Sequence, residues 1–130
     1  MIKLTTLENG LRIISHHMPS VQSVSFAVYN KVGSRDETKE INGTAHFLEH
    51  MAFKGTTNRS STEIAETIDR VGGSINAATG KDITKYTVDL LAEDLNIGVD
   101  VITDILQNST FKIKEFEKER SVILEEISMN

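Results

Sequence analysis

Alternating apolar and polar residues predict five β-strands in this chain. Val24, Phe26 and Val28 fall on one face of the clearest of them. The Asn9-Gly10 pair predicts a tight turn between the first two strands, and Gly80-Lys81-Asp82 predicts a hairpin loop between the last two. The predicted strands are 2–6, 11–17, 23–32, 74–79 and 83–91.

Four other segments have helical character. Ser60 and Glu63 form a capping-box pattern that opens one helix, and Gly72-Gly73 ends it. A later segment repeats apolar residues at helical intervals, at Leu95, Val99, Ile102 and Leu106. The predicted helices are 44–53, 60–71, 92–108 and a last one that starts near 112 and continues to Asn130; the polar, turn-rich stretch 33–43 is predicted as a loop.

This order of elements predicts an α+β fold, with a mostly antiparallel sheet and helices packed on one side of it. The last helix keeps its apolar residues to the end, at Val122, Ile123, Leu124 and Ile127, with no capping residue to close it. We therefore expect residues 1–130 to form the N-terminal part of a larger domain.

Composition and charge exclude several classes of protein. The 130 residues are 38% hydrophobic and 25% charged with one Pro, which is typical of a folded domain. A net charge of −5 argues against non-specific binding to nucleic acid. No run approaches the roughly 20 apolar residues of a membrane helix, so no membrane association is expected. With no Cys, any metal must be held by His and carboxylate side chains.

The strongest chemical signal is the set His46, Glu49 and His50. Residues four apart on a helix lie on one side, one turn from each other, so both imidazoles can bind one metal ion. Glu49 is too close in sequence to His50 to share that ion comfortably, but it can reach a water molecule bound to it. This is the H-x-x-E-H arrangement, in which the Glu acts as general base.

The alternative is a pair of surface histidines on an acidic helix. The flanking residues argue against it, because they are apolar and would surround the histidines with a half-buried site of low dielectric constant. These flanking residues are Phe47, Leu48, Met51 and Phe53.

A catalytic zinc site needs a third protein ligand, and the last helix offers two candidates. Glu119 and Glu126 are seven residues apart, about 20° apart around the helix axis, and border the apolar stripe. Carboxylates in such a place are costly unless they are paired or bound to a metal. From spacing alone, an exposed helix carboxylate is still the default interpretation of Glu126.

Several segments together resemble the pitrilysin/insulinase family of metallopeptidases, most closely the branch of the mitochondrial processing peptidase β-subunit and its bacterial relatives. They cover essentially the whole chain, in order and at the spacing of the family. The segments are 43–56, 32–35, 72–77, 84–86 and 119–127.

The resemblance implies one Zn²⁺ per chain, with His46, His50 and Glu126 as ligands. It also implies that Glu49 takes a proton from zinc-bound water as this water attacks the scissile carbonyl, and that Glu119 supports a ligand.

The same resemblance implies three substrate-binding residues. Phe53 matches a position in the pocket for the residue after the cleaved bond, and core packing is its alternative role. Asn76 and Ala77 match the edge strand on which the family binds an extended peptide, and a hairpin strand without a ligand is their alternative.

The resemblance thus implies a zinc endopeptidase that cleaves extended peptides, including presequence-like or short ones. Members of the family have a second homologous half, which this chain lacks. The alternative is therefore a truncated or non-catalytic zinc-binding chain that needs a partner subunit or a C-terminal domain for activity. The N-terminus lacks the pattern of a signal or transit peptide, so we expect a bacterial cytoplasmic protein, or a mitochondrial matrix protein from which a leader has been removed.

Overall fold

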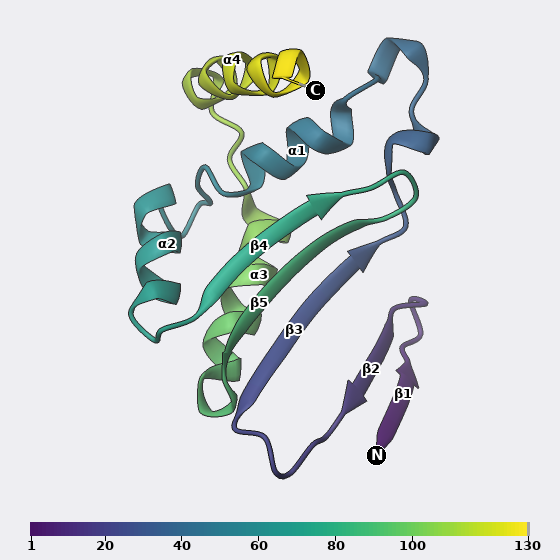
Figure 1. Cartoon of the computed structure of the whole chain (residues 1–130), viewed down its shortest axis with the longest axis vertical. Helices are drawn as coiled ribbons and strands as arrows, with labels where there is room; N and C mark the ends of the chain where they lie inside the picture. The colour runs from purple at the N-terminus through teal and green to yellow at the C-terminus, as the bar shows by residue number, and fades with distance from the viewer. Residues whose placement is uncertain (130) are drawn as a thin grey trace.

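The computed structural model describes residues 1–129, and it confirms the α+β class (Figure 1). In chain order its strands and α-helices are β1 (Ile2–Thr6), β2 (Arg12–His16), β3 (Ser23–Asn30), α1 (Thr44–Ala52), α2 (Ser61–Asp69), β4 (Ser74–Thr79), β5 (Thr84–Leu91), α3 (Leu95–Asn108) and α4 (Ile113–Met129). Short 3₁₀ helices lie at Ser34–Asp36, Lys39–Ile41 and Ala92–Asp94. No helix of residues 1–129 is both long and apolar enough to cross a membrane.

The central sheet has three antiparallel strands in the order β3-β5-β4. Phe26 of β3 and Ile75 of β4 both pair with Val88, which places the middle strand β5 at the centre of the core. Strand β4 lies at one edge of this sheet, and α1 lies beside it (Figure 1). The predicted alternation of β3 is confirmed, because its residues at 24, 26 and 28 pack against the core.

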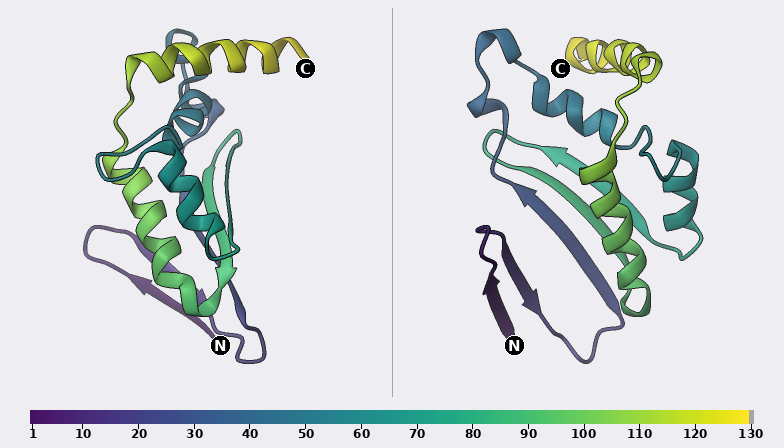
Figure 2. Two further views of the ribbon diagram at one scale, coloured as in Figure 1. Left: turned by 90° about the vertical axis from the view of Figure 1, so that its left-hand side faces the viewer. Right: turned by 180° about the vertical axis from the view of Figure 1, so that it is seen from behind.

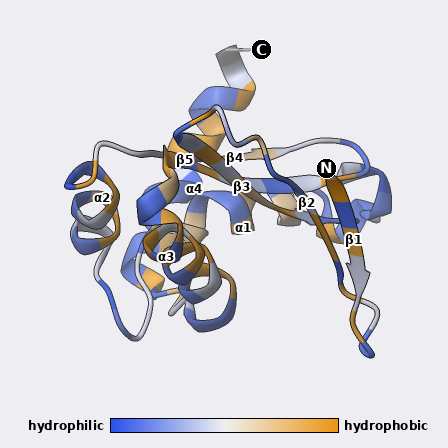
Figure 3. Cartoon of the chain, turned by 90° about the horizontal axis from the view of Figure 1, so that it is seen from below, coloured by the Kyte–Doolittle hydropathy of each residue, from blue (hydrophilic) through white to orange (hydrophobic). Residues whose placement is uncertain are grey.

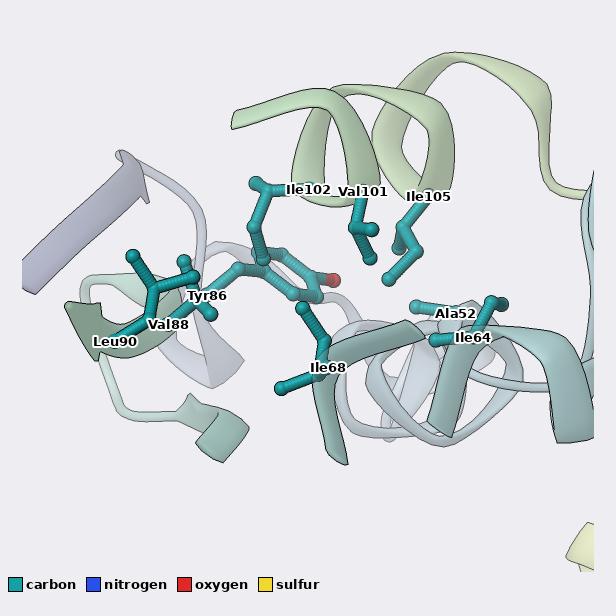
Figure 4. Packing of buried hydrophobic residues seen from close by; sticks show 9 residues of the cluster. All are labelled: Ala52, Ile64, Ile68, Tyr86, Val88, Leu90, Val101, Ile102 and Ile105. Carbon is teal, nitrogen blue, oxygen red and sulfur yellow. The ribbon is translucent and has the colours of Figure 1, made fainter. Parts of the chain in front are cut away.

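Helix α3 packs across one face of the sheet, with α2 beside it on the same side (Figure 2). Gly98 makes this packing close: a Cβ atom there would lie 2.9 Å from Cγ1 of Val88 and 3.0 Å from Cδ2 of Leu90. The inward side chains of β5, α2 and α3 form one apolar cluster with Ala52 of α1 (Figure 4). Its fully or nearly buried members are Ala52, Ile64, Ile68, Tyr86, Val88, Leu90, Val101, Ile102 and Ile105.

The buried side of α3 overlaps its apolar stripe only in part. Ile102 is fully buried, Leu95 and Val99 are half-buried, and Leu106 is 39% exposed. The core also receives Val101 and Ile105, since the close approach at Gly98 turns their side of the helix toward β5. Apolar residues occur on both sides of this helix, so their spacing alone did not identify the buried side.

Helix α2 begins as predicted. The Ser60 hydroxyl accepts a hydrogen bond from the Glu63 backbone N–H at 3.1 Å, and the Glu63 carboxylate accepts one from the Ser60 N–H at 3.3 Å. These reciprocal bonds satisfy two backbone donors that a helix start otherwise leaves free. The helix is thereby fixed so that Ile64 and Ile68 enter the core.

Strands β1 and β2 form a separate two-stranded sheet, joined by the predicted Asn-Gly turn. All of their residues are exposed, including apolar ones such as Ile2 at 70% and Ile14 at 68%. Figure 3 shows apolar positions on this hairpin, which lies away from α2 and α3. The single mostly antiparallel sheet expected from the sequence is therefore, within residues 1–129, two antiparallel sheets.

Some boundaries also differ from those predicted. The loop 33–43 contains two 3₁₀ turns, and the predicted helix 92–108 starts with a 3₁₀ turn before α3 begins at Leu95. The last helix was predicted to reach Asn130, which lies outside the described residues.

A buried carboxylate fixes the loop that follows α1. Asp104 of α3 is 5% exposed and accepts hydrogen bonds from the Thr56 hydroxyl at 2.7 Å and the Asn58 amide at 2.7 Å. The Arg59 guanidinium and the Asn108 amide also donate to it, each at 2.9 Å. Burial alone would raise the pKa of Asp104, but these four donors outweigh it and lower the pKa from 3.8 to about 2.

This shift predicts a dependence of stability on pH. Since the folded pKa lies below the unfolded one, the stabilisation is fully present above pH 4 and is lost as the pH falls toward 2. The full effect is about 2 kcal/mol, of which roughly 1 kcal/mol is lost by pH 3. We expect Asp104→Asn to be less stable than wild type at pH 6 and the difference to narrow by about 1 kcal/mol at pH 3, measured by urea unfolding.

The matched control is Asp100→Asn, since Asp100 also pairs with Arg59, at 2.5 Å, but its side chain is 69% exposed. We expect this variant to keep the pH dependence of the wild type. An equal loss of stability in both variants would mean that the charge of Arg59, rather than the burial of Asp104, controls the loop.

Candidate metal centre

Helix α1 carries the H-x-x-E-H residues, and a distant acid caps its N-terminus. Gly43 occupies the N-cap position with a left-handed φ of 88° and has no side chain that could cap the helix. The Glu37 carboxylate takes this role: Oε1 accepts from the Gly43 N–H at 2.9 Å and Oε2 from the Ala45 N–H at 2.6 Å. An anion at this end also interacts favourably with the helix dipole. The turn that contains His46 is thus fixed from outside the helix.

His46 and His50 lie side by side, one turn apart on α1. Their rings meet edge to face with centroids 4.7 Å apart, and their Nε2 atoms are 3.1 Å apart. Oε2 of Glu126 lies 3.4 Å from Nε2 of His46 and 3.5 Å from Nε2 of His50. Three ligand atoms from two helices therefore converge on one point.

The three donors fit a zinc ion. Metal bonds of about 2.0–2.2 Å at tetrahedral angles place neighbouring ligand atoms roughly 3.3 Å apart, close to the spacings seen here. Two imidazole nitrogens and one carboxylate oxygen are also a ligand set of catalytic zinc sites, which leave a fourth position open. His46, His50 and Glu126 are the residues that would hold the ion.

A further carboxylate of α4, that of Glu119, orients His50. Its Oε2 lies 2.9 Å from Nδ1 of His50, and its Oε1 lies 2.8 Å from Nζ of Lys54. Burial acts to raise the pKa of Glu119, but the hydrogen bonds from Lys54 and His50 outweigh it and hold this pKa below its ordinary value. An ionised carboxylate only accepts hydrogen bonds, so this contact favours the His50 tautomer that carries its proton on Nδ1, which leaves the Nε2 lone pair for a metal.

Glu49 is held from the opposite side, by the sheet. The Thr79 hydroxyl, at the end of β4, donates a hydrogen bond to Oε2 of Glu49. The charge of Glu49 also acts on Tyr86 of β5, whose pKa is raised by burial first and by this charge second. Glu49 thus lies between the metal ligands of α1 and the edge strand β4.

Helix α4 is docked on α1 by apolar contacts as well as by Glu119. Phe116 stacks on Phe47 with ring centroids 4.3 Å apart, and Ile123 is 7% exposed. Figure 1 shows α4 lying above α1, on the side away from the sheet. This docking brings Glu119 and Glu126 to the two histidines.

The expected substrate-binding residues lie at the C-terminal end of α1 and on β4. Phe53 and Asn76 both line an open cavity of about 340 Å³ together with Ile75 and residues of α2. Phe53 also packs against the core, so its alternative role is present in the same structure. Ala77 is half-buried, packs against the core, and donates its N–H to Oδ1 of Asn76 at 2.9 Å.

Sequence reasoning missed three residues of this site: Glu37, Lys54 and Thr79. Glu37 caps α1 across a loop, Thr79 reaches Glu49 over a separation of 30 residues, and Lys54 reaches Glu119 from the segment that follows α1. The contacts of Thr79 and Lys54 join segments far apart in sequence, and the contact of Glu37 depends on the fold of the loop before α1, so no local spacing pattern indicated them.

The chain is similar to known proteins of one family. Residues 12–130 match the model of the family described as Insulinase (Peptidase family M16). The chain is 50% identical over 129 residues to an uncharacterized zinc protease of Bacillus subtilis, YmxG, covering 99% of this chain and 32% of that protein. It is 46% identical over 128 residues to an uncharacterized zinc protease of Streptomyces coelicolor, SCO5738, covering 98% of this chain and 28% of that protein.

A solved structure has the same fold. The crystal structure of a protease from Helicobacter pylori superposes with a TM-score of 0.91 at 34% identity, over 97% of this chain and 30% of that one. The chain therefore spans about 30% of the length of the proteins that it matches.

The capping of α1 yields a prediction. We expect Glu37→Ala to lower the free energy of unfolding by about 1–2 kcal/mol, because two N-terminal donors and a favourable charge–dipole interaction are lost. Amide hydrogen exchange at Ala45 and His46 should accelerate, since the first turn frays. Glu40→Ala, which removes an exposed acid of the same loop, is the control and should change neither quantity. Unchanged exchange at Ala45 in Glu37→Ala would contradict the capping role.

Proposed function

The chain belongs to the insulinase family of peptidases, family M16, and from this membership we propose that it provides the metal centre of a zinc-dependent endopeptidase. The observation that carries the proposal is the convergence of His46, His50 and Glu126 on one point at spacings suited to zinc. We propose one Zn²⁺ per chain, held by these three residues. The names of the relatives, which are zinc proteases, support the metal and the general reaction.

Glu49 is the general base in this proposal. When bound, zinc would supply Lewis-acid chemistry, lowering the pKa of a coordinated water toward about 7 and polarising the scissile carbonyl. Since Thr79 occupies Oε2 of Glu49, Oε1 is the oxygen that accepts the proton of the attacking water. The same oxygen then returns that proton to the leaving amine, so the carboxylate is restored when the peptide bond has broken. Glu119 acts through His50, whose proton it holds on Nδ1.

The substrate is proposed to be a peptide bound in extended conformation along β4. This strand forms an edge of the three-stranded sheet, and an edge strand can pair with an added strand. Asn76 and Ala77 lie on β4, and the cavity lined by Phe53 and Asn76 would receive one side chain of the peptide. Presequence-like or short peptides suit this mode of binding, and the processing-peptidase branch of the family is our finer assignment.

We further propose that residues 1–130 are the N-terminal part of the peptidase domain. The coverage of about 30% of each relative supports this division. It also favours a second candidate function, a chain that binds zinc but needs a homologous partner subunit or a further domain for turnover. Groups that position the substrate and stabilise charge lower the catalytic barrier by several kcal/mol. In this second candidate function, the partner subunit or the further domain supplies those groups. The relatives named above are bacterial, which supports a bacterial cytoplasmic protein over one of the mitochondrial matrix.

Zinc binding tests the ligand set. We expect the metal-free chain to bind one equivalent of zinc in a competition titration with a chelating indicator. Glu126→Gln should weaken this binding by more than the ~10–100-fold that loss of a supporting group costs, because a direct ligand is replaced by a neutral amide. Glu125→Gln makes the same chemical change at an exposed neighbouring position and should leave the affinity unchanged. Equal affinities for the Glu126 variant and the wild type would remove Glu126 from the ligand set.

Peptide cleavage tests the role of Glu49. With zinc and a fluorogenic Arg-containing peptide, we expect Glu49→Gln to lower kcat by about 10²–10⁴-fold, since the amide cannot accept the proton. Zinc affinity should change little, because Glu49 is not a ligand in this proposal. Turnover by Glu49→Gln equal to that of the wild type would exclude Glu49 as the base. Zinc binding by the wild type without any turnover would favour the second candidate.

A further inference from the structure

Lys54 is a charged residue beside the metal centre that the proposed reaction does not use. It follows α1 closely, and its backbone N–H donates to the carbonyl oxygen of Met51 at 3.1 Å. Its side chain is 34% exposed, but its ammonium is directed to Glu119, whose side chain is only 8% exposed. The pair therefore joins a half-buried cation to a nearly buried carboxylate.

The two oxygens of Glu119 have different partners. Oε1 lies 2.8 Å from Nζ of Lys54, while Oε2 lies 2.9 Å from Nδ1 of His50. A carboxylate that is bound at both oxygens cannot rotate about its last bond without breaking one of these contacts. Lys54 thus fixes the plane of the Glu119 carboxylate, and with it the direction from which Oε2 contacts the His50 imidazole.

The position of Lys54 is itself fixed on both sides in the chain. Before it, α1 is packed on the core through Met51 and Ala52, which are 1% and 5% exposed. After it, the loop is anchored to α3 by the Thr56 hydroxyl on Asp104 at 2.7 Å and by the Thr57 N–H on the Asn108 carbonyl at 3.0 Å. The ammonium is therefore presented to Glu119 from a rigid base rather than from a mobile loop.

We propose that Lys54 is a positioning residue of the metal centre, which holds the Glu119 carboxylate so that it keeps the His50 proton on Nδ1 and leaves Nε2 free for the metal. This inference rests on the proposed function. It adds a third side chain to the contacts behind the metal, which run from Lys54 through Glu119 to His50.

A merely structural ion pair would behave differently. Exposed pairs contribute little to stability, because solvent screens the two charges. In this pair the carboxylate is buried. Removal of the Lys54 ammonium leaves the Glu119 carboxylate with His50 as its remaining side-chain partner within residues 1–129. The effect of the loss is then expected at the metal site rather than in global stability alone.

The experiment compares Lys54→Met with the wild type in the metal-free and zinc-titrated chain. We expect the zinc dissociation constant of Lys54→Met to rise by about 10–100-fold, the cost of losing an outer-shell partner of a ligand. In the metal-free chain, ¹H–¹⁵N NMR of the imidazole nitrogens should show His50 protonated on Nδ1 in the wild type and a mixture of both tautomers in the variant. Lys54→Arg should recover most of the affinity, because charge and donors remain.

Lys118→Met is the matched control. It removes a lysine charge next to Glu119, but the ammonium of Lys118 lies 3.9 Å from Glu115 and its side chain is 63% exposed. We expect its zinc affinity to stay within about twofold of the wild type, as for other exposed pairs. Far-UV circular dichroism checks that each variant folds, and Lys54→Gln, which keeps one donor group without the charge, replaces Lys54→Met if that variant does not.

Three results separate the possible failures. Wild-type zinc affinity and a wild-type tautomer in Lys54→Met, with loss of zinc in Glu126→Gln, would overturn this inference and leave the proposed function intact. Failure of the wild-type chain to bind zinc at all would overturn the proposed function. An altered KM for peptide with unchanged zinc affinity would assign Lys54 to the substrate and equally overturn the positioning role.

Discussion

The contact between α1 and α4 is the constraint on which the site depends, and Glu119 is its centre. This buried carboxylate joins His50 and Lys54 of the α1 region to the last helix. Because Glu126 follows two helical turns later on the same side of α4, a helix fixed at Glu119 also carries Glu126 to His46. The stack of Phe47 on Phe116 closes the other end of the contact. Without this docking the two histidines would lack a third donor.

The helix that carries the histidines is held at both ends by buried or half-buried acids. Glu37 caps its first turn, and Asp104 fixes the loop that follows its last turn. The chain has 19 acidic residues against 14 basic ones, yet four acids in and near the site are matched by backbone N–H groups, amides, hydroxyls or cations: Glu37, Glu49, Asp104 and Glu119. Such pairing lowers the free-energy cost of keeping these carboxylates charged in a low-dielectric region. It also holds the segments that carry the candidate metal ligands in place.

The sequence predicted the local elements well and their packing less well. The capping box at Ser60 and Glu63 and the alternation in β3 depend on neighbours in the chain, and both are confirmed. The apolar spacing in α3 did not settle which side is buried, because apolar residues lie on two sides of that helix and the approach at Gly98 selects one of them. The β1–β2 hairpin was expected to join a common sheet, but within residues 1–129 it pairs with itself. Pairing between strands is set by tertiary contacts, which a run of alternating residues does not contain.

At the candidate site the same division holds. The interval of four between His46 and His50 determines that their imidazoles share one side of α1, since helical geometry is local. The interval of seven between Glu119 and Glu126 likewise determines that both lie on one side of α4. Only the tertiary structure decided that these two sides face each other, across a separation of 69 residues between His50 and Glu119. It also brought in Glu37, Lys54 and Thr79. The physical reason is that helix periodicity fixes the direction of side chains about one axis, whereas the meeting of two axes is decided by burial and pairing over the whole fold.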